Sequence, residues 1–92
     1  MIKSFRCSDT EKLFGGKRVR RLVNVEVVAM RKLAMLNAAT RLDDLRIPPA
    51  NRLDALKGNR KGQHSIRIND QWRVCFVWTD TGPDAVEIVD YH

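Results

Sequence analysis

The chain has no long apolar run and few residues of the kinds that bind metals or form disulfides. Its hydrophobic residues, 43% of the total, sit in short blocks far below the roughly 20 residues that span a bilayer, so we expect no membrane segment. Cys7 and Cys75 are its only cysteines, and together with two histidines they lack metal-ligand spacing. We therefore expect buried structural thiols, no metal and no cofactor.

Other absences limit the organisation and the location of the protein. Residues 1–14 lack the apolar region of a secretory signal, so we expect an intracellular, cytoplasmic protein. We find no internal repeat, no low-complexity stretch and no linker that would separate two domains. Residues 1–92 therefore predict a single domain with a modest core.

Positive charge is what the chain has in excess. Seventeen Lys and Arg residues against eleven Asp and Glu give a formal net charge of +6. In a domain of this size, such an excess favours a polyanionic partner. Composition alone leaves DNA, RNA, the ribosome and an acidic protein open as that partner.

The first half of the chain predicts an edge strand and two helices. Residues 2–5 form a short, partly apolar strand, and a brief helix begins at residue 8 or 9 and ends at Phe14, before two glycines. The main helix spans about 24–39, and one apolar face is formed by Val25, Ala29, Leu33 and Leu36. We expect its other side to be solvated, with Arg31, Lys32 and Asn37.

The second half predicts three antiparallel strands, at about 64–68, 72–78 and 85–89. Apolar residues alternate in each strand, as in a sheet with one face on a core. His64, Trp72 and Trp78 fall on that apolar side, so we expect them in or beside the core. The element order indicates an α+β fold in which two N-terminal helices pack on an antiparallel sheet.

The strand register follows from the same alternation, because a slip by one residue would bury arginine. A loop at 69–71 pairs Ile68 with Trp72 and sets Arg67 opposite Arg73. Like charges in this position are destabilising by roughly 0.2–1 kcal/mol. Either a bound anion removes the conflict or the two side chains splay into water.

Two segments of the second half carry a resemblance to a known family. They are "LDALKGNRKGQHSIRINDQWRVCFVW" and the closing "VEIVDYH". Their ordered combination of Leu-Lys-Gly, a basic glycine turn, Ser-Ile-Arg, Trp-Arg and Asp-Tyr-His resembles HigB toxins of the RelE superfamily, close to the relative GraT. The likeness covers essentially the whole chain.

This resemblance implies the toxin of a type II toxin–antitoxin pair. Such a toxin is a metal-independent endoribonuclease that cuts messenger RNA in the ribosomal A site and inhibits translation and growth. Its implied fold is RelE-like, similar to small microbial ribonucleases reduced to one sheet and two helices. The implied partners are a HigA-type antitoxin, the ribosome with its mRNA, and the operon promoter DNA through the antitoxin complex, with no membrane.

RNA cleavage without metal requires proton transfer at the 2′-hydroxyl, cations for the phosphate and an acid for the leaving oxygen. Lys57 and Arg73 match basic positions of the family's site, and both are suited to holding the scissile phosphate. Asp90, Tyr91 and His92 match its terminal motif. Tyrosine titrates near 10, so Tyr91 needs cationic neighbours to act as a base. The resemblance leaves the base and the acid unassigned.

One catalytic position departs from the family. Some members have histidine three residues before Lys57, where this chain has Asp54, a weaker base near neutral pH that repels phosphate. Either the histidine is dispensable, or this protein cleaves more slowly or with a different assignment of acid and base. Five cations are predicted to contact RNA without reading its sequence: Arg60, Lys61, Arg67, Lys17 and Arg18. Gln71 is predicted to contact a base edge.

A different class of function remains open. A non-catalytic basic module that binds RNA or protein would keep the cations but tolerate loss of Tyr91 and His92. A helix-turn-helix regulator is disfavoured, because only one long helix is predicted and no recognition helix follows it after a short turn.

Overall fold

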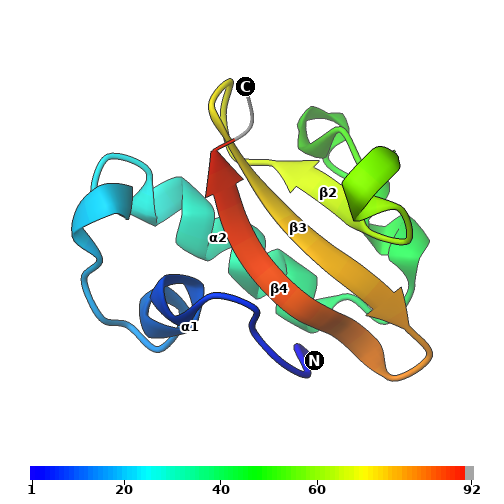
Figure 1. Ribbon diagram of the computed structural model, residues 1–92, viewed down its shortest axis with the longest axis horizontal. Coiled ribbons are helices and arrows are strands. Elements are labelled where there is room, and N and C mark those ends of the chain that lie inside the picture. Colours follow the sequence, from blue (N-terminus) through cyan, green and yellow to red (C-terminus); the bar gives the residue numbers. More distant parts are fainter. Residues whose placement is uncertain (91–92) are drawn as a thin grey trace.

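A sheet with α2 packed on one of its faces and α1 beside β4 forms the body of the molecule (Figure 1). The computed structural model describes residues 1–90, within which the order of strands is β1-β2-β3-β4 and all pairs are antiparallel. The two α-helices come first and the strands follow: α1 (Ser8–Phe14), α2 (Glu26–Ala38), β1 (Asp54–Ala55), β2 (His64–Arg67), β3 (Trp72–Thr79) and β4 (Gly82–Asp90). The predicted α+β class is confirmed.

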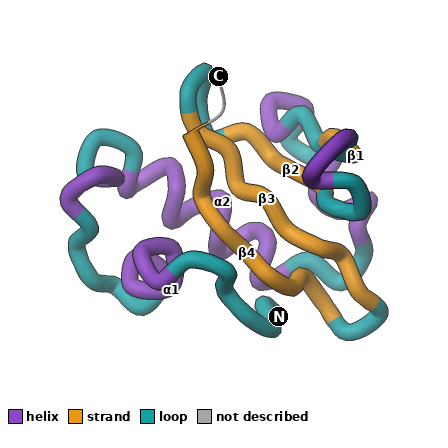
Figure 2. Tube along the Cα trace, viewed as in Figure 1, coloured by secondary structure: helices purple, strands orange, loops and turns teal. Residues whose placement is uncertain are grey.

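Short 3-10 helices fill the connections between these elements. They are η1 (Arg20–Leu22), η2 (Leu42–Arg46), η3 (Pro49–Asn51) and η4 (Gly58–Arg60). The first three connect α1, α2 and β1, and η4 connects β1 to β2 (Figure 2). No helix within residues 1–90 has the length and apolarity needed to cross a membrane.

The core lies between α2 and the sheet. The predicted helix face is buried, with Ala29, Leu33 and Leu36 fully inaccessible. From the sheet, Ile66 and Val74 pack into the same cluster and are equally inaccessible. Each fully buried aliphatic side chain of this kind contributes about 1.5–3 kcal/mol, so this interface dominates the stability of the fold.

The prediction that Lys32 lies on a solvated side of α2 is wrong. This side chain is only 8% exposed, and its Nζ donates a hydrogen bond to Oδ1 of Asn51 at 2.6 Å. Asn51 lies in η3, is fully buried, and donates from Nδ2 to the carbonyl oxygen of Leu45 at 3.1 Å. Burial lowers the pKa of Lys32, and the charges of Arg31 and Arg67 lower it further.

Arg31 and Asn37, the other two residues predicted to be solvated on α2, differ in exposure. Arg31 is exposed, as predicted. Asn37 is half-buried, and its Oδ1 accepts a hydrogen bond from the backbone N–H of Ile2 at 2.8 Å. Segments before and after α2 in the chain therefore cover parts of the helix that its own sequence indicates to be solvated.

The predicted register of β2 and β3 is confirmed: Ile66 pairs with Val74, and Arg67 with Arg73. Strand β4 is longer than predicted and contains a bulge. Cys75 pairs with Glu87 but Val77 pairs with Asp84, so β4 has one extra residue at this point. The bulge includes Ala85, whose φ of 50° is left-handed.

The predicted strand at 2–5 is wrong, because these residues form only a single parallel bridge, Phe5 to Val86. The segment nonetheless lies along the outer edge of β4 (Figure 2). Three backbone hydrogen bonds hold it there: Lys3 N–H to the Pro83 carbonyl, Val86 N–H to the Ser4 carbonyl, and Arg6 N–H to the Val86 carbonyl. Further along β4, the hydroxyl of Thr10 accepts from the Ile88 N–H at 2.9 Å.

The buried lysine generates a test of stability. Asn51→Ala leaves the Lys32 ammonium and the Leu45 carbonyl without this partner, so we expect the free energy of unfolding to fall by about 2–4 kcal/mol. Lys32→Met removes the buried charge and keeps most of the volume, so we expect a change of less than about 1.5 kcal/mol. Urea unfolding of both variants and the wild type measures these differences.

The pH dependence of the comparison provides the control. Because the folded state lowers the pKa of Lys32, the unfolded state binds more protons, and the wild type gains stability relative to Lys32→Met as pH rises toward 10. Equal stability losses in Asn51→Ala and Lys32→Met, with no change in their difference from the wild type across pH, would contradict a charged buried lysine.

Candidate functional site

The face of the sheet away from α2, which we call the outer face, carries two rows of side chains. Directly paired residues of neighbouring strands point to the same face, so the register defines both rows. The first row runs across all strands as Asp54, Ser65, Cys75 and Glu87. The second row consists of Arg67, Arg73 and Val89. Polar and charged groups from four strands therefore lie side by side.

Arg73, a predicted catalytic residue, lies on β3 near the end of the sheet where β2 and β3 are joined, and it is half-buried. Its Nη1 donates a hydrogen bond to Oγ of the fully buried Ser65 at 2.6 Å. Arg67, directly opposite, forms a short ion pair with Asp70 from the loop between β2 and β3. The predicted conflict between the two arginines is thus relieved by separate partners within the chain.

Arg60 reaches over the outer face from η4. Its Nη1 donates to Oε1 of Glu87 at 2.8 Å and to Oε1 of Gln63 at 3.2 Å. The Glu87 side chain is only 17% exposed, so this ion pair is better shielded from solvent than the other ion pairs described within residues 1–90. A polar cavity of about 420 Å³ opens beside it, lined also by Arg6 and Asn59.

Cys75 lies between these charges and is completely buried, as predicted. Burial raises the pKa of its thiol, and Glu87 raises it too, while the cations Arg60 and Arg73 act in the opposite direction. The thiol therefore stays protonated near neutral pH. Cys75 pairs directly with Ser65 and Glu87, which bind Arg73 and Arg60, so these charged groups are gathered around the thiol.

Asp54, Lys57 and Lys61 lie at the side of the outer face where β1 leads into η4. Asp54 is exposed on β1 and pairs with Ser65 of β2. Strand β2 therefore lies between Asp54 and Arg73, which is on β3. Lys57 directly precedes η4 and Lys61 directly follows it, and both are exposed. These cations and Asp54 therefore border the same surface as Arg73.

The C-terminal motif is described only in part. Asp90 ends β4, is exposed and pairs with Trp72. Its Oδ2 accepts a hydrogen bond from Nε2 of Gln71, a predicted base-reading residue, at 3.1 Å. Tyr91 and His92, the predicted proton-transfer residues, lie outside the described residues.

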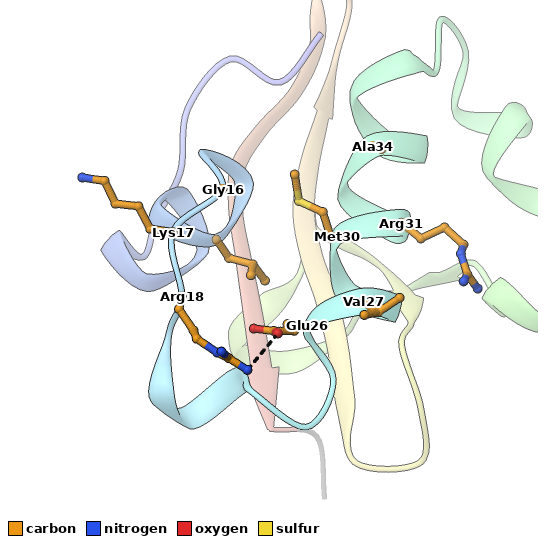
Figure 3. Close-up of a pocket in the computed structure, with 9 residues that line it drawn as sticks. Gly16, Lys17, Arg18, Glu26, Val27, Met30, Arg31 and Ala34 are labelled. Carbon is orange, nitrogen blue, oxygen red and sulfur yellow. Dashed lines mark ion pairs between the residues drawn. The ribbon is translucent and has the colours of Figure 1, made fainter.

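Lys17 and Arg18 are not brought together with the rest of the predicted site. They follow α1 and line a groove against α2 (Figure 3). Arg18 forms an ion pair with Glu26 at 3.5 Å. Of the predicted RNA-binding residues, Arg60, Lys61 and Arg67 are at or beside the outer face. Gln71 instead contacts Asp90, whose pairing with the core-packed Trp72 turns it to the other face, and Lys17 and Arg18 form a separate group.

Sequence reasoning missed Ser65 and Glu87 as parts of the site. Alternation assigned both to the polar side of the sheet, but their partners Arg73 and Arg60 are 8 and 27 positions away. His64 and Trp72 agree with the prediction: both are half-buried, His64 stacks on Phe76 at 6.2 Å between ring centroids, and Trp72 packs against the core.

Taken together, the outer face offers fixed guanidinium groups and no metal cluster. Within residues 1–90, no three His, Cys, Asp or Glu side chains are grouped so as to hold a metal ion. A guanidinium is planar, and the spacing of its N–H groups matches two oxygens of a phosphate. The arrangement suits binding of a phosphodiester across the strands.

Comparison with known proteins gives the class of the protein. The chain matches a family model described as "RelE-like toxin of type II toxin-antitoxin system HigB" over residues 3–92. A match of this extent assigns it to the RelE-like toxins of type II toxin–antitoxin systems. Within that class, the chain belongs to the HigB-like family, and membership implies an antitoxin as partner.

Two relatives share this similarity. "Toxin HigB-1" of Vibrio cholerae serotype O1 is 42% identical over 82 residues, which cover 87% of this chain and 86% of the relative. An uncharacterised protein of Haemophilus influenzae is 42% identical over 53 residues, 58% of this chain and 52% of the relative. The resemblance to HigB toxins is confirmed, and the closer likeness to GraT stays a prediction.

The two thiols differ in a way that a thiol reagent detects. Cys7, before α1, is half-buried and not buried as predicted. Burial raises the pKa of its thiol, but hydrogen bonds from the Thr10 and Asp9 backbone and from Arg21 outweigh this effect and lower the pKa. We expect 5,5′-dithiobis(2-nitrobenzoate) to modify Cys7 in the folded protein at least about tenfold faster than Cys75. Absorbance at the thiolate product's wavelength measures both rates.

The variant Cys7→Ser identifies the reacting thiol. It removes the fast phase and leaves only the slow modification that accompanies opening of the sheet. If the fast phase persisted in Cys7→Ser, Cys75 would be accessible and its burial under the charges of the outer face would be wrong.

Proposed function

We propose that the protein is a ribosome-dependent endoribonuclease that cuts messenger RNA in the A site and thereby inhibits translation and growth. The observation that carries the proposal is the direct pairing of Arg67 with Arg73 on the outer face, next to the strand that leads into the Asp-Tyr-His motif. Membership of the HigB-like toxin family supports it. The fold is then the RelE type, similar to microbial ribonucleases.

In this proposal, Arg73 and Lys57 hold the scissile phosphate. The 2′-hydroxyl oxygen attacks phosphorus as its proton leaves, the bond from phosphorus to the 5′-oxygen breaks, and that oxygen receives a proton. Tyr91 and His92 carry the two proton transfers. The guanidinium and ammonium groups stabilise the negative charge that accumulates on the phosphate, so the chemistry proceeds without a metal.

The remaining cations bind rather than react. Arg60, Lys61 and Arg67 contact the RNA backbone around the site, and Gln71 reads a base edge while its amide holds Asp90 in position. Lys17 and Arg18, which lie apart from the outer face in the groove beside α2, contact ribosomal RNA. The protein acts in the cytoplasm, where a HigA-type antitoxin binds it and their complex binds the operon promoter.

The first experiment maps new 5′ ends on cellular mRNA after brief induction from a tightly repressed promoter. We expect the wild type to cut at fixed codon positions within translated regions. Arg73→Ala removes a guanidinium that contacts the reacting phosphate, so we expect cleavage to fall by about 10²–10³-fold. The matched control is Arg46→Ala, whose exposed guanidinium pairs with Asp43 in η2, and it should cut as the wild type does.

The double variant Tyr91→Ala, His92→Ala tests the terminus in the same assay. Loss of all cuts supports proton transfer by this pair. Cuts that persist in the double variant would move the chemistry to Lys57, Arg73 or Asp54. No cuts by a well-folded wild type would favour the alternative, a non-catalytic basic module that binds RNA or protein.

We expect replacement of Asp54 to give variants that cleave RNA faster than the wild type. Asp54→Asn removes a negative charge that repels the phosphate, so we expect cleavage to rise about two- to fivefold. Asp54→His adds a group that titrates near neutral pH, so we expect a larger rise with a pH dependence near 6.5. Single-turnover cleavage of mRNA on programmed ribosomes measures both rates. Slower cleavage by both variants would instead make Asp54 a required group.

A further inference from the structure

Helix α2 carries a second apolar line that the core does not use. Val27, Met30 and Ala34 follow each other at the spacing of one helical face (Figure 3). By helical spacing, this face is turned away from Leu33 and Leu36, which belong to the core cluster. The side chain of Val27 is 69% exposed. The same helix buries Lys32. Helix α2 therefore buries a lysine on one side and leaves this apolar face without a partner among residues 1–90.

The apolar line forms one wall of a groove of about 610 Å³. The other wall comes from the end of α1, with Leu13, and from the loop after it, with Gly16. Gly16 lies across the groove from α2 (Figure 3). Cations stand at the rim: Lys17 and Arg18 on the loop, and Arg31 on the helix. Among the described residues, only Arg18 of these three has a carboxylate partner, Glu26. The groove is therefore apolar along its floor, and its edges carry three cations against the one carboxylate of Glu26, so they are positive on balance.

We propose that this groove is the docking site of the antitoxin, and that it receives an amphipathic helix with apolar side chains inside and acidic side chains at the rim. From Val27 to Ala34, the apolar line measures about 10 Å, which matches two turns of a partner helix. Aspartate or glutamate of that helix meets Lys17 and Arg31. The site follows from membership of the toxin family and does not depend on nuclease activity.

The chemistry of the groove selects this occupant over two others. A second copy of the chain, which carries a net charge of +6, would bring a rim of cations against another basic surface. RNA binds through phosphate contacts and base stacking, and an aliphatic floor offers no aromatic platform for a base. An acidic amphipathic helix satisfies both the floor and the rim.

Docking at this groove would also explain neutralisation, a step that rests on the proposed function. Lys17 and Arg18 are the cations proposed to contact ribosomal RNA, and both line the groove. A seated helix covers these two cations at the rim and so blocks their contact with ribosomal RNA, in which Val27 of the floor takes no part. The outer face, on the other side of the sheet from α2, is not covered in this way.

The test is a titration of purified toxin with its antitoxin by calorimetry. Val27→Glu places a carboxylate in the apolar floor, facing an acidic partner, and we expect Kd to rise about 30-fold or more. The free protein should tolerate the change, because the side chain is exposed and glutamate is favourable in the first turn of a helix. The matched control, Ile47→Glu, changes a 75% exposed side chain outside the groove and should alter Kd less than about threefold.

A second arm measures growth with and without the antitoxin. We expect Val27→Glu toxin to arrest growth as the wild type does and to escape rescue by the antitoxin. Wild-type affinity of Val27→Glu would overturn the proposal. So would a wild-type dimer, seen by sedimentation, that Val27→Glu disperses without changing the affinity for antitoxin. If wild-type toxin does not arrest growth, the proposed nuclease function fails, while the titration still decides the docking site.

Discussion

The pairing of β3 with a neighbour on each side is the constraint on which both the core and the candidate site depend. In this one strand, Val74 faces α2 while Arg73 and Cys75 face outward. A slip by one residue would bury Arg73 and expose Val74. The fold would then lose apolar burial and would also have to desolvate a charge, and both changes are unfavourable. The packing of the core therefore fixes the position of the guanidinium.

The same constraint explains how much of the fold and of the site could be predicted. Alternation in the sequence was enough to place Arg67 opposite Arg73, because register follows from which residues must be buried. It could not supply their partners. Ser65 receives Arg73 two strand positions from Arg67, and Arg60 reaches Glu87 from a 3-10 helix whose path no local pattern specifies. Contacts between distant segments depend on tertiary packing rather than on periodicity.

Helix α2 shows the limit of periodicity most clearly. Its strongest apolar line was identified and is buried, but a helix has several sides, and neighbouring segments decide what happens on each. Asn51, beyond two prolines, provides the hydrogen bond that allows Lys32 to be buried. No segment among residues 1–90 does the same for Val27. Charge on a helix therefore does not by itself mark the solvated side.

Basic residues are similarly divided by the fold. Those of the β1–β2 connection and the strands, such as Lys57 and Arg73, are held at the outer face, and those after α1, such as Lys17, are held beside α2. The net charge of the chain is thus presented as two surfaces with different neighbours, one polar and one apolar. Surfaces of such different character are suited to different partners, and the strand register keeps them on opposite sides of the sheet.

The N-terminal segment along β4 has a consequence for how the protein behaves when it is concentrated. An outermost strand with unpaired N–H and C=O groups is a template to which a strand of another chain can add, and such addition leads to aggregation. Here the backbone of residues 3–6 and the hydroxyl of Thr10 already occupy part of that template. At the opposite side of the sheet, β1 is only two residues long. The sheet is therefore protected at both margins from growing by the addition of foreign strands, and association with other molecules is left to side chains.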